Sequence, residues 1–508
     1  MAKRARIILM LLAAAVLSAL APAGFAEFDN PKAKQPPRAK PHRRSAAEGV
    51  PPLPLPATPL RRTERKRQPA PPALVGMINF SQQQFRIVDG KRVAADAFPT
   101  TQIDIERLMG FANHRLKIRY RYVPTSLGKF SWDPRELPLL YITGWTPMPK
   151  LEDALIDKLR RYLYDGGTLI VHAQCGRPEF VKSARAQIAR LFPKRPLGPI
   201  DSDSPLFHAY YNINAMRVRK NAEPFKKMPP YLEAVYLGCR PAIIFSPIDL
   251  NCGWDVVKHP IQGGILYHQE DATQLGVNII TTVLANLKYA RSWGVKKVFH
   301  EQEDSTRDQL VIAQVVHEGD WDPTPHGLPN LMKYVQKNTT LNVQFKRELV
   351  EPANLDVFKH PVLYMTGLRD FKLSETQVAQ LRKYLTSGGV LVADASAGRA
   401  AFDKAFRREI KRVLPKQTLD RLPADSPLYQ MPYKIRTVDY SRMLKAQQPE
   451  LNAPTLEGVR IDGQLAVIYS PVGLANGWED LGFAYNRGYA PSDAVRIGVN
   501  IFAYSLTH

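Results

Sequence analysis

The chain has 508 residues, 44% of them hydrophobic, which suits about two or three ordinary domains. The formal net charge is +23, and much of this charge lies in one proline-rich segment near the N-terminus. After the first 26 residues no stretch is apolar for long enough to span a bilayer, which argues against a multi-span membrane protein.

The first 26 residues have the pattern of a secretory signal peptide. Lys3, Arg4 and Arg6 form a basic start, and residues 7–20 form an apolar run of 14 residues. About 20 residues are needed to cross a bilayer, so this run is short for an anchor. Small residues then lead to Ala26, after which we predict cleavage. The expected product is exported to the periplasm or the cell exterior. An uncleaved anchor is the alternative.

Residues 27–72 are predicted to form a disordered, basic, proline-rich linker. Between residues 31 and 72 there are 11 lysines and arginines, two glutamates and 12 prolines. Such a segment cannot bury enough apolar surface to offset its ordering entropy. It is either a solvated spacer or a tether to anionic envelope polymer or lipid head groups. It lacks the interleaved aromatic residues of nucleic-acid-binding platforms, so no nucleic-acid partner is predicted.

The remainder of the chain contains two copies of one pattern, which we assign to domains at residues 73–292 and 293–508. "YLYDGGTLIVHAQCG" starts at Tyr162, and "YLTSGGVLVADASAG" starts at Tyr384. In each copy an apolar strand precedes an amphipathic helix, the helix ends at two glycines, and a second apolar strand follows. Strands without polar alternation indicate a parallel sheet that is covered on both faces by right-handed βαβ crossovers.

Later segments of the two copies agree as well. "DSPL" begins at residues 203 and 425, "GW" at 253 and 477, and "GVNI" at 276 and 498. Chance is a poor explanation for so many matches at nearly constant spacing. We therefore predict that one ancestral domain was duplicated, and that the copies share a backbone course while the chemistry at their strand ends has diverged.

The second copy resembles a bacterial family known as domain of unknown function 4159. The resemblance rests on "EGDWDPTP" (318–325), "YMTGLRDFKLSETQVAQLRKYLTSGGVLVADAS" (364–396), "FDKAFRREIKRVLP" (402–415) and "LPADSPLY" (422–429). The first copy keeps the strand, helix and glycine pair but lacks the first and third of these segments. The resemblance implies a glutamine-amidotransferase-like α/β fold, with two tandem three-layer α/β/α sandwiches and mostly parallel sheets. It implies no settled activity. Gly-rich phosphate loops and Walker patterns are absent from the sequence, and no cofactor is predicted.

Cys175 is the candidate nucleophile of the first domain, because it follows a central strand and precedes Gly176. A catalytic thiol needs a neighbouring base or cation, and His172 and Arg177 are close in sequence. The usual nucleophile turn has small residues two positions before and after the nucleophile, whereas Arg177 occupies the later position. The second copy has Ala397 in place of the thiol. The alternative is that Cys175 is a small buried residue without catalytic use.

The other two cysteines are not expected to form a disulfide. Cys239 and Cys252 should lie on the arms of one hairpin, separated by about 30 Å at 3.3 Å per residue, which is beyond disulfide reach. We therefore expect three free thiols. No metal-binding sequence pattern occurs, so no metal site is predicted.

The second domain offers candidate ligand-binding residues in two places. Asp320, Trp321 and Asp322 follow a predicted strand, and Asp394 ends the central one. Carboxylates at the carboxyl ends of parallel strands line the usual ligand crevice of such folds. The alternative is that these residues are structural, capping loops or covering the sheet edge. The repeated tryptophan of "GW" is expected to close the end of each core rather than to stack on a ligand.

The sequence favours an exported protein that binds or scaffolds without catalysis, because nucleophile, base and acid do not coincide in either copy. One alternative is a hydrolase or amidase that uses Cys175 with His172. Another is carbohydrate binding at the crevice near Asp394 and Trp321. The sequence names no substrate, partner protein or oligomeric state.

Overall fold

The structure is a computed structural model that describes residues 69–78, 84–88, 91–95, 103–127, 131–255, 264–293, 310–339, 343–354, 359–479 and 483–507. The predicted signal peptide and nearly all of the predicted linker lie outside these residues. Within the described part of the chain, every helix is too short or too polar to cross a membrane.

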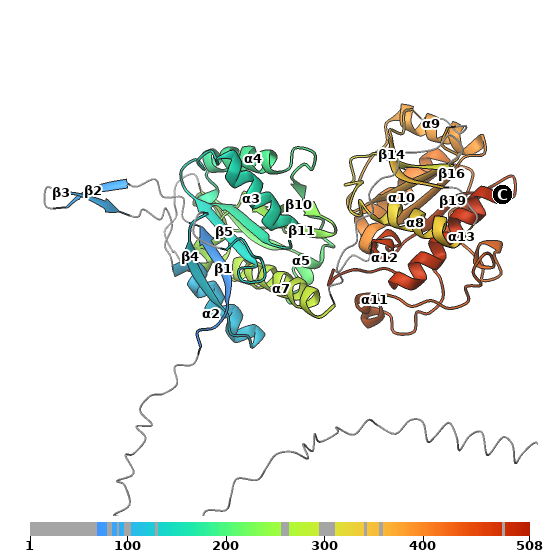
Figure 1. Ribbon diagram of the computed structural model, residues 1–508. Helices are drawn as coiled ribbons and strands as arrows, with labels where there is room; N and C mark the ends of the chain where they lie inside the picture. Colours follow the sequence, from blue (N-terminus) through green and yellow to red (C-terminus); the bar gives the residue numbers. More distant parts are fainter. Residues whose placement is uncertain are drawn as a thin grey trace, which may run out of the picture. The chain divides into compact units, whose positions relative to one another are not determined.

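The first domain is built on a seven-stranded sheet (Figure 1). The five strands from β4 to β11 run parallel, and β10 and β7 continue the sheet in antiparallel fashion. In sheet order the strands are β4 (Arg121–Thr125), β1 (Ala73–Ile78), β5 (Leu139–Gly144), β6 (Thr168–Ala173), β11 (Arg240–Ser246), β10 (Glu233–Leu237) and β7 (Gly198–Pro199).

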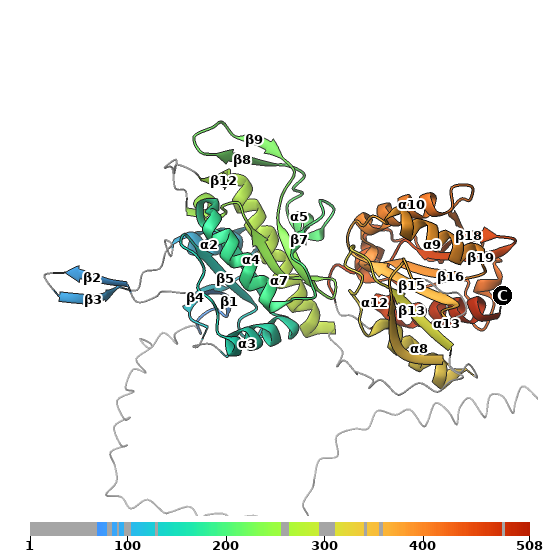
Figure 2. The ribbon, with the colours of Figure 1, turned by 90° about the horizontal axis from the view of Figure 1, so that it is seen from above.

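Helices cover both faces of this sheet (Figures 1 and 2). Successive residues of β5 alternate between two cores: Leu139 and Tyr141 belong to one, and Leu140 and Ile142 to the other. Helices α2 (Ile103–Leu116) and α7 (Gln269–Trp293) contribute to the first core, and α3 (Asp153–Tyr164) and α4 (Pro178–Leu191) to the second. This arrangement explains why the strand sequences are apolar throughout.

The second domain repeats the sheet with the same strand order. Its five parallel strands are again followed by two strands, each of which pairs with the preceding strand in antiparallel fashion. In sheet order they are β14 (Val343–Val350), β13 (Leu310–Val315), β15 (Val362–Gly367), β16 (Val390–Ala395), β19 (Gln464–Ser470), β18 (Glu457–Ile461) and β17 (Asp420–Arg421).

The helices of the second domain are placed in the same way (Figure 2). Helices α8 (Gly327–Asn338) and α13 (Pro491–Thr507) pack in one core, and α9 (Glu375–Thr386) and α10 (Ala400–Val413) pack in the other. The prediction of two α/β domains with mostly parallel sheets is confirmed.

The two copies match strand for strand. Leu169 lies on β6, between Leu140 of β5 and Ile243 of β11. Leu391 lies on β16, between Leu363 of β15 and Val467 of β19. Equivalent positions therefore occupy equivalent elements, as the duplication requires.

The predicted helix ends are also present. Gly166 and Gly388 have φ of +109° and +92°, the left-handed conformation in which a side chain is unfavourable. Ser374 caps α9 through the backbone N–H of Gln377, whose side chain bonds the Ser374 N–H in return. These local signals fix where α9 begins and where α3 and α9 end.

The repeated tryptophans close the cores, as predicted. Trp254 and Trp478 are 3% and 4% exposed. Each indole N–H donates to a helix carbonyl at 2.8 Å, that of Ala272 in the first domain and that of Ala494 in the second.

The remaining elements correspond only in part: η1, α5 and α6 of the first domain have η2, η3 and α12 as their equivalents in the second. In the first domain they are β2 (Gln84–Val88), β3 (Lys91–Ala95), η1 (Gln174–Gly176), α5 (Pro205–His208), β8 (Met216–Lys220), β9 (Lys226–Met228), α6 (Asn251–Asp255) and β12 (Ile265–Tyr267). In the second they are η2 (Ser396–Gly398), η3 (Pro427–Tyr429), α11 (Arg442–Gln447) and α12 (Ala475–Trp478). Strands β12, β8 and β9 form a small additional sheet in the first domain.

Candidate functional site

The candidate site of the first domain lies where two neighbouring strands end. Strands β6 and β11 are adjacent and parallel, and His172 pairs with Ser246 near their carboxyl ends. The turn η1 follows β6, and the loop leading to α6 follows β11. Residues that are far apart in sequence therefore meet at one edge of the sheet, the usual ligand site of open α/β sheets.

Cys175 occupies a strained turn. Its backbone has φ 52° and ψ 20°, a left-handed conformation that costs a non-glycine residue about 1–2 kcal/mol. This geometry resembles the strand-to-helix turn that presents a nucleophile. Ala397 in the second domain has the same φ and ψ. Because the copy without a thiol keeps the strain, the turn is a property of the fold and is no evidence for a nucleophile.

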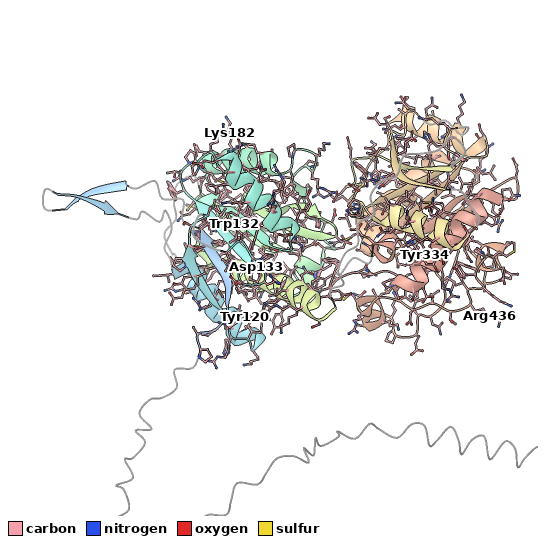
Figure 3. All side chains as sticks on the ribbon, viewed as in Figure 1. Tyr120, Trp132, Asp133, Lys182, Tyr334 and Arg436 are labelled. Atoms are coloured by element: carbon pink, nitrogen blue, oxygen red, sulfur yellow. The ribbon has the colours of Figure 1, made fainter. Side chains whose placement is uncertain are left out.

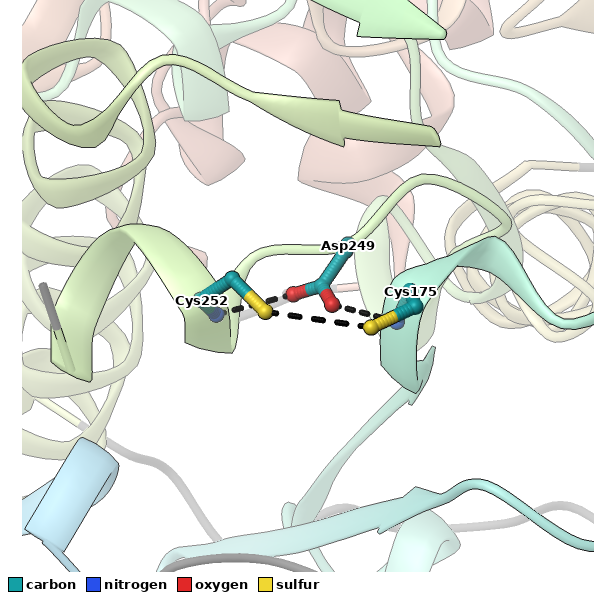
Figure 4. A group of neighbouring side chains, drawn as sticks. All are labelled: Cys175, Asp249 and Cys252. Atoms are coloured by element: carbon teal, nitrogen blue, oxygen red, sulfur yellow. Dashed lines mark hydrogen bonds between the residues drawn. The ribbon is translucent and has the colours of Figure 1, made fainter. Parts of the chain in front are cut away.

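Asp249 and Cys252 are the neighbours of Cys175 (Figure 4). The Asp249 carboxylate accepts the backbone N–H of Cys175 through one oxygen and that of Cys252 through the other, the latter at 2.9 Å. The two sulfur atoms are 3.9 Å apart. Hydrogen bonding to Cys175, burial and the nearby Asp249 carboxylate all raise the pKa of the Cys252 thiol. Both cysteines, like Cys239, are free thiols.

His172 is hydrogen-bonded to Tyr141 and not to Cys175. Its Nε2 lies 2.7 Å from the Tyr141 hydroxyl, and its buried Nδ1 has no hydrogen-bond partner among the described residues. The ring packs against those of Tyr141 and Trp254, with centroids 5.4 and 5.8 Å away. Burial lowers the pKa of His172 to about 4, so the imidazole is neutral at pH 7. The two residues of the predicted dyad are near in sequence, but no hydrogen bond joins them.

Tyr141 links His172 to a buried carboxylate that the sequence analysis did not single out. The Tyr141 hydroxyl donates to Oδ2 of Asp104, on α2, at 2.8 Å. Burial raises the pKa of Asp104 to about 6. The cluster of Asp104, Tyr141 and His172 is thus a buried polar network in the core of the first domain.

A cavity of about 560 Å³ adjoins the strand ends of the first domain. Gly176 and Ile248, the chain neighbours of Cys175 and Asp249, line it. Lys182 also lines it from α4, where Figure 3 shows its side chain at the surface of the domain. Cys175, Asp249 and Cys252 are not themselves among the residues that line it.

In the second domain, the Asp394 carboxylate is hydrogen-bonded to groups of the same domain. Tyr364 donates to one carboxylate oxygen at 2.6 Å, and the backbone N–H groups of Leu474 and Ala475 donate to the other at 2.8 and 3.3 Å. Burial raises the pKa of Asp394. This side chain is fully buried and ties the β16 end to the loop before α12.

The loop after β13 holds the other three candidates. Asp322 pairs with Arg347 of β14, and the Trp321 carbonyl accepts the Gln314 side chain at 2.8 Å. Asp320 has φ 57°, and burial raises its pKa. Among the described residues, no hydrogen bond joins Asp394 directly to this loop, so the predicted crevice combining Asp394 with Trp321 stays a prediction.

The family model described as a domain of unknown function, DUF4159, matches the chain twice, over residues 94–284 and 311–506. These two segments make up most of the sequence. The chain belongs to the family of domain of unknown function 4159. It is a tandem repeat of that domain, and the first copy is a member despite lacking two of the second copy's characteristic segments. None of the curated proteins matches the chain.

Within this tandem DUF4159 chain, sequence reasoning missed Asp249 and Cys252 as partners of Cys175. A comparison of the two copies contains the signal. The matched "SP" and "GW" segments align Asp249 with Gly473 and Cys252 with Asn476, and "GG" aligns Cys175 with Ala397. The two thiols and the carboxylate therefore occur only in the first copy at these positions, while the surrounding strands occur in both.

Proposed function

We propose that this chain is an exported envelope protein whose first domain binds a ligand at its strand ends without turning it over. The observation that carries this proposal is the environment of Cys175. Its amide N–H donates to Asp249 and its sulfur faces that of Cys252. The Nε2 of His172 contacts the Tyr141 hydroxyl, and its Nδ1 has no hydrogen-bond partner among the described residues. A thiol without a base is a poor nucleophile near neutral pH.

Export is supported by the N-terminal sequence, with its basic start, apolar run and small residues ending at Ala26. The basic proline-rich segment that follows suits a tether to anionic envelope polymer or lipid head groups. Sequencing the N-terminus of the mature protein from cell fractions tests this part. A mature chain starting at Glu27 in the periplasm or medium is expected, and an unprocessed cytosolic chain would contradict it.

Binding without turnover is tested by comparing the wild-type protein with Cys175→Ala on a panel of ester, amide and peptide substrates. We expect the two proteins to show the same background rates. Hydrolysis by the wild type that disappears in a folded Cys175→Ala variant would establish the hydrolase alternative instead. Thermal shifts with soluble glycans test carbohydrate binding, which would require a shift that Trp321→Ala removes.

A further inference from the structure

Three donor groups converge at the strand ends of the first domain. One ligand atom each from Cys175, Asp249 and Cys252 lies within 4.8 Å of the others. Figure 4 shows the two thiols pointing toward each other with the carboxylate beside them. Two sulfur atoms and one carboxylate oxygen form a donor set typical of zinc and related thiophilic cations.

The separation of the sulfurs fits a shared cation. Two sulfurs at the Zn–S distance of about 2.3 Å and a tetrahedral angle lie about 3.8 Å apart. The observed Sγ–Sγ distance of Cys175 and Cys252 is 3.9 Å. A disulfide would require about 2.05 Å. The spacing is that of a thiol–thiol hydrogen bond, is too long for a disulfide, and would accommodate a shared metal ion without moving the two sulfurs apart.

The surrounding backbone orients the donors. The N–H groups of Cys175 and Cys252 both bond the Asp249 carboxylate, which fixes its plane between the two thiols. Cys175 is held by its strained turn after β6, and Asp249 follows β11, the neighbouring strand. Hydrogen bonds to a metal-binding side chain hold it in position and raise the affinity for the metal ion.

We propose that Cys175, Asp249 and Cys252 bind one thiophilic divalent cation of the zinc class. The three protein donors leave the fourth position of a tetrahedral site for water or an anion. This inference goes beyond the proposed function, because it assigns a ligand and holds whether or not the domain is catalytic.

The chain contains two internal comparisons for this site. In the second domain the equivalent positions are Ala397, Gly473 and Asn476, which supply no thiolate or carboxylate. The other group of possible ligands in the described residues is His268, Glu270 and Asp271. Arg217 already pairs with the two carboxylates of that group at 2.7 and 2.6 Å, so its positive charge opposes a cation there.

Metal binding at a cysteine pair releases protons. Zn²⁺ binds thiolates, so each Zn–S bond formed at a thiol transfers one proton to the buffer, up to two per ion. Because protons are released on binding, zinc affinity should rise with pH.

The experiment is a zinc titration of the reduced full-length chain against a chromophoric chelator at several pH values. We expect one zinc per chain, with affinity that rises with pH. Cys175→Ser and Cys252→Ser should each lose at least about 100-fold in affinity, since outer-shell changes alone cost 10–100-fold. Cys239→Ser is the matched control and should retain the wild-type affinity.

A second measurement needs no variant and so does not depend on the folding of one. Zinc should slow alkylation of Cys175 and Cys252, as located by peptide mass spectrometry. No zinc uptake by the wild type, or unchanged affinity in Cys175→Ser and Cys252→Ser, would overturn the proposal. Zinc binding accompanied by zinc-dependent hydrolysis would keep this site and overturn the proposed function, so the two failures are distinguishable.

Discussion

Replacing either Asp104 or His172 should change how the stability of the first domain depends on pH, and in opposite directions. Both side chains are buried and touch the Tyr141 hydroxyl. Burial disfavours the charged form of each group, so it raises the pKa of the Asp104 carboxyl and lowers the pKa of the His172 imidazole. Asp104→Asn and His172→Gln each remove one of these titrations.

The size of each effect follows from the pKa shifts. Burial raises the pKa of Asp104 from 3.8 to about 6, so between those values the unfolded chain loses a proton that the folded chain keeps. Stability therefore falls by about 3 kcal/mol as the pH rises through this window. Burial lowers the pKa of His172 from 6.5 to about 4, so there the unfolded chain holds the extra proton. Stability then rises by about 3 kcal/mol, and in the wild type the two contributions largely cancel.

The assay is calorimetric unfolding of the full chain between pH 4 and 7, with each variant compared to the wild type at every pH. Relative to the wild type, Asp104→Asn should gain about 3 kcal/mol as the pH rises, and His172→Gln should lose about as much. Asp157→Asn, at a side chain that is 67% exposed, controls for altered net charge. Difference curves that are flat for both core variants would refute the argument.

Further tests address the equivalence of the copies and the local signals. Trp254→Phe and Trp478→Phe each lose one buried indole hydrogen bond, so each should lower the unfolding free energy by about 1–2 kcal/mol in denaturant titrations, and a cost in one copy only would contradict equivalence. Ser374→Ala removes the α9 capping box and should cost about 1 kcal/mol, whereas Ser374→Asp should retain most of it. Gly388→Ala places a side chain at φ +92° and should cost about 1 kcal/mol in a thermal melt, although no neighbour lies within 4 Å.

The fold could be predicted because its signals are local. Apolar strand runs, the helix stripe before Gly166 and the capping box at Ser374 each act within a few residues of where they occur. Because the domain is duplicated, the strand–helix–strand pattern occurs twice in the sequence, which made the order of these elements unambiguous. The extra sheet formed by β12, β8 and β9 was not predicted, because its short strands carry no periodic pattern long enough to recognise.

The candidate site could be predicted only in part. Cys175 was identified from its place after a central strand, and three free thiols were expected. Its partners Asp249 and Cys252 follow β11, which joins β6 through parallel pairing that depends on the order of strands in the sheet. That order is a tertiary property. Sequence proximity instead favoured His172, whose side chain lies against Tyr141 because of the direction it takes from the strand.

The most direct test of the account is an anomalous difference map from crystals of the full-length chain soaked in zinc. The account requires one strong peak within bonding distance of the sulfur atoms of Cys175 and Cys252, and none at Ala397 and Asn476 of the second copy. A map whose zinc peak lies at His268 and Asp271, or that is empty between the two thiols, would contradict it.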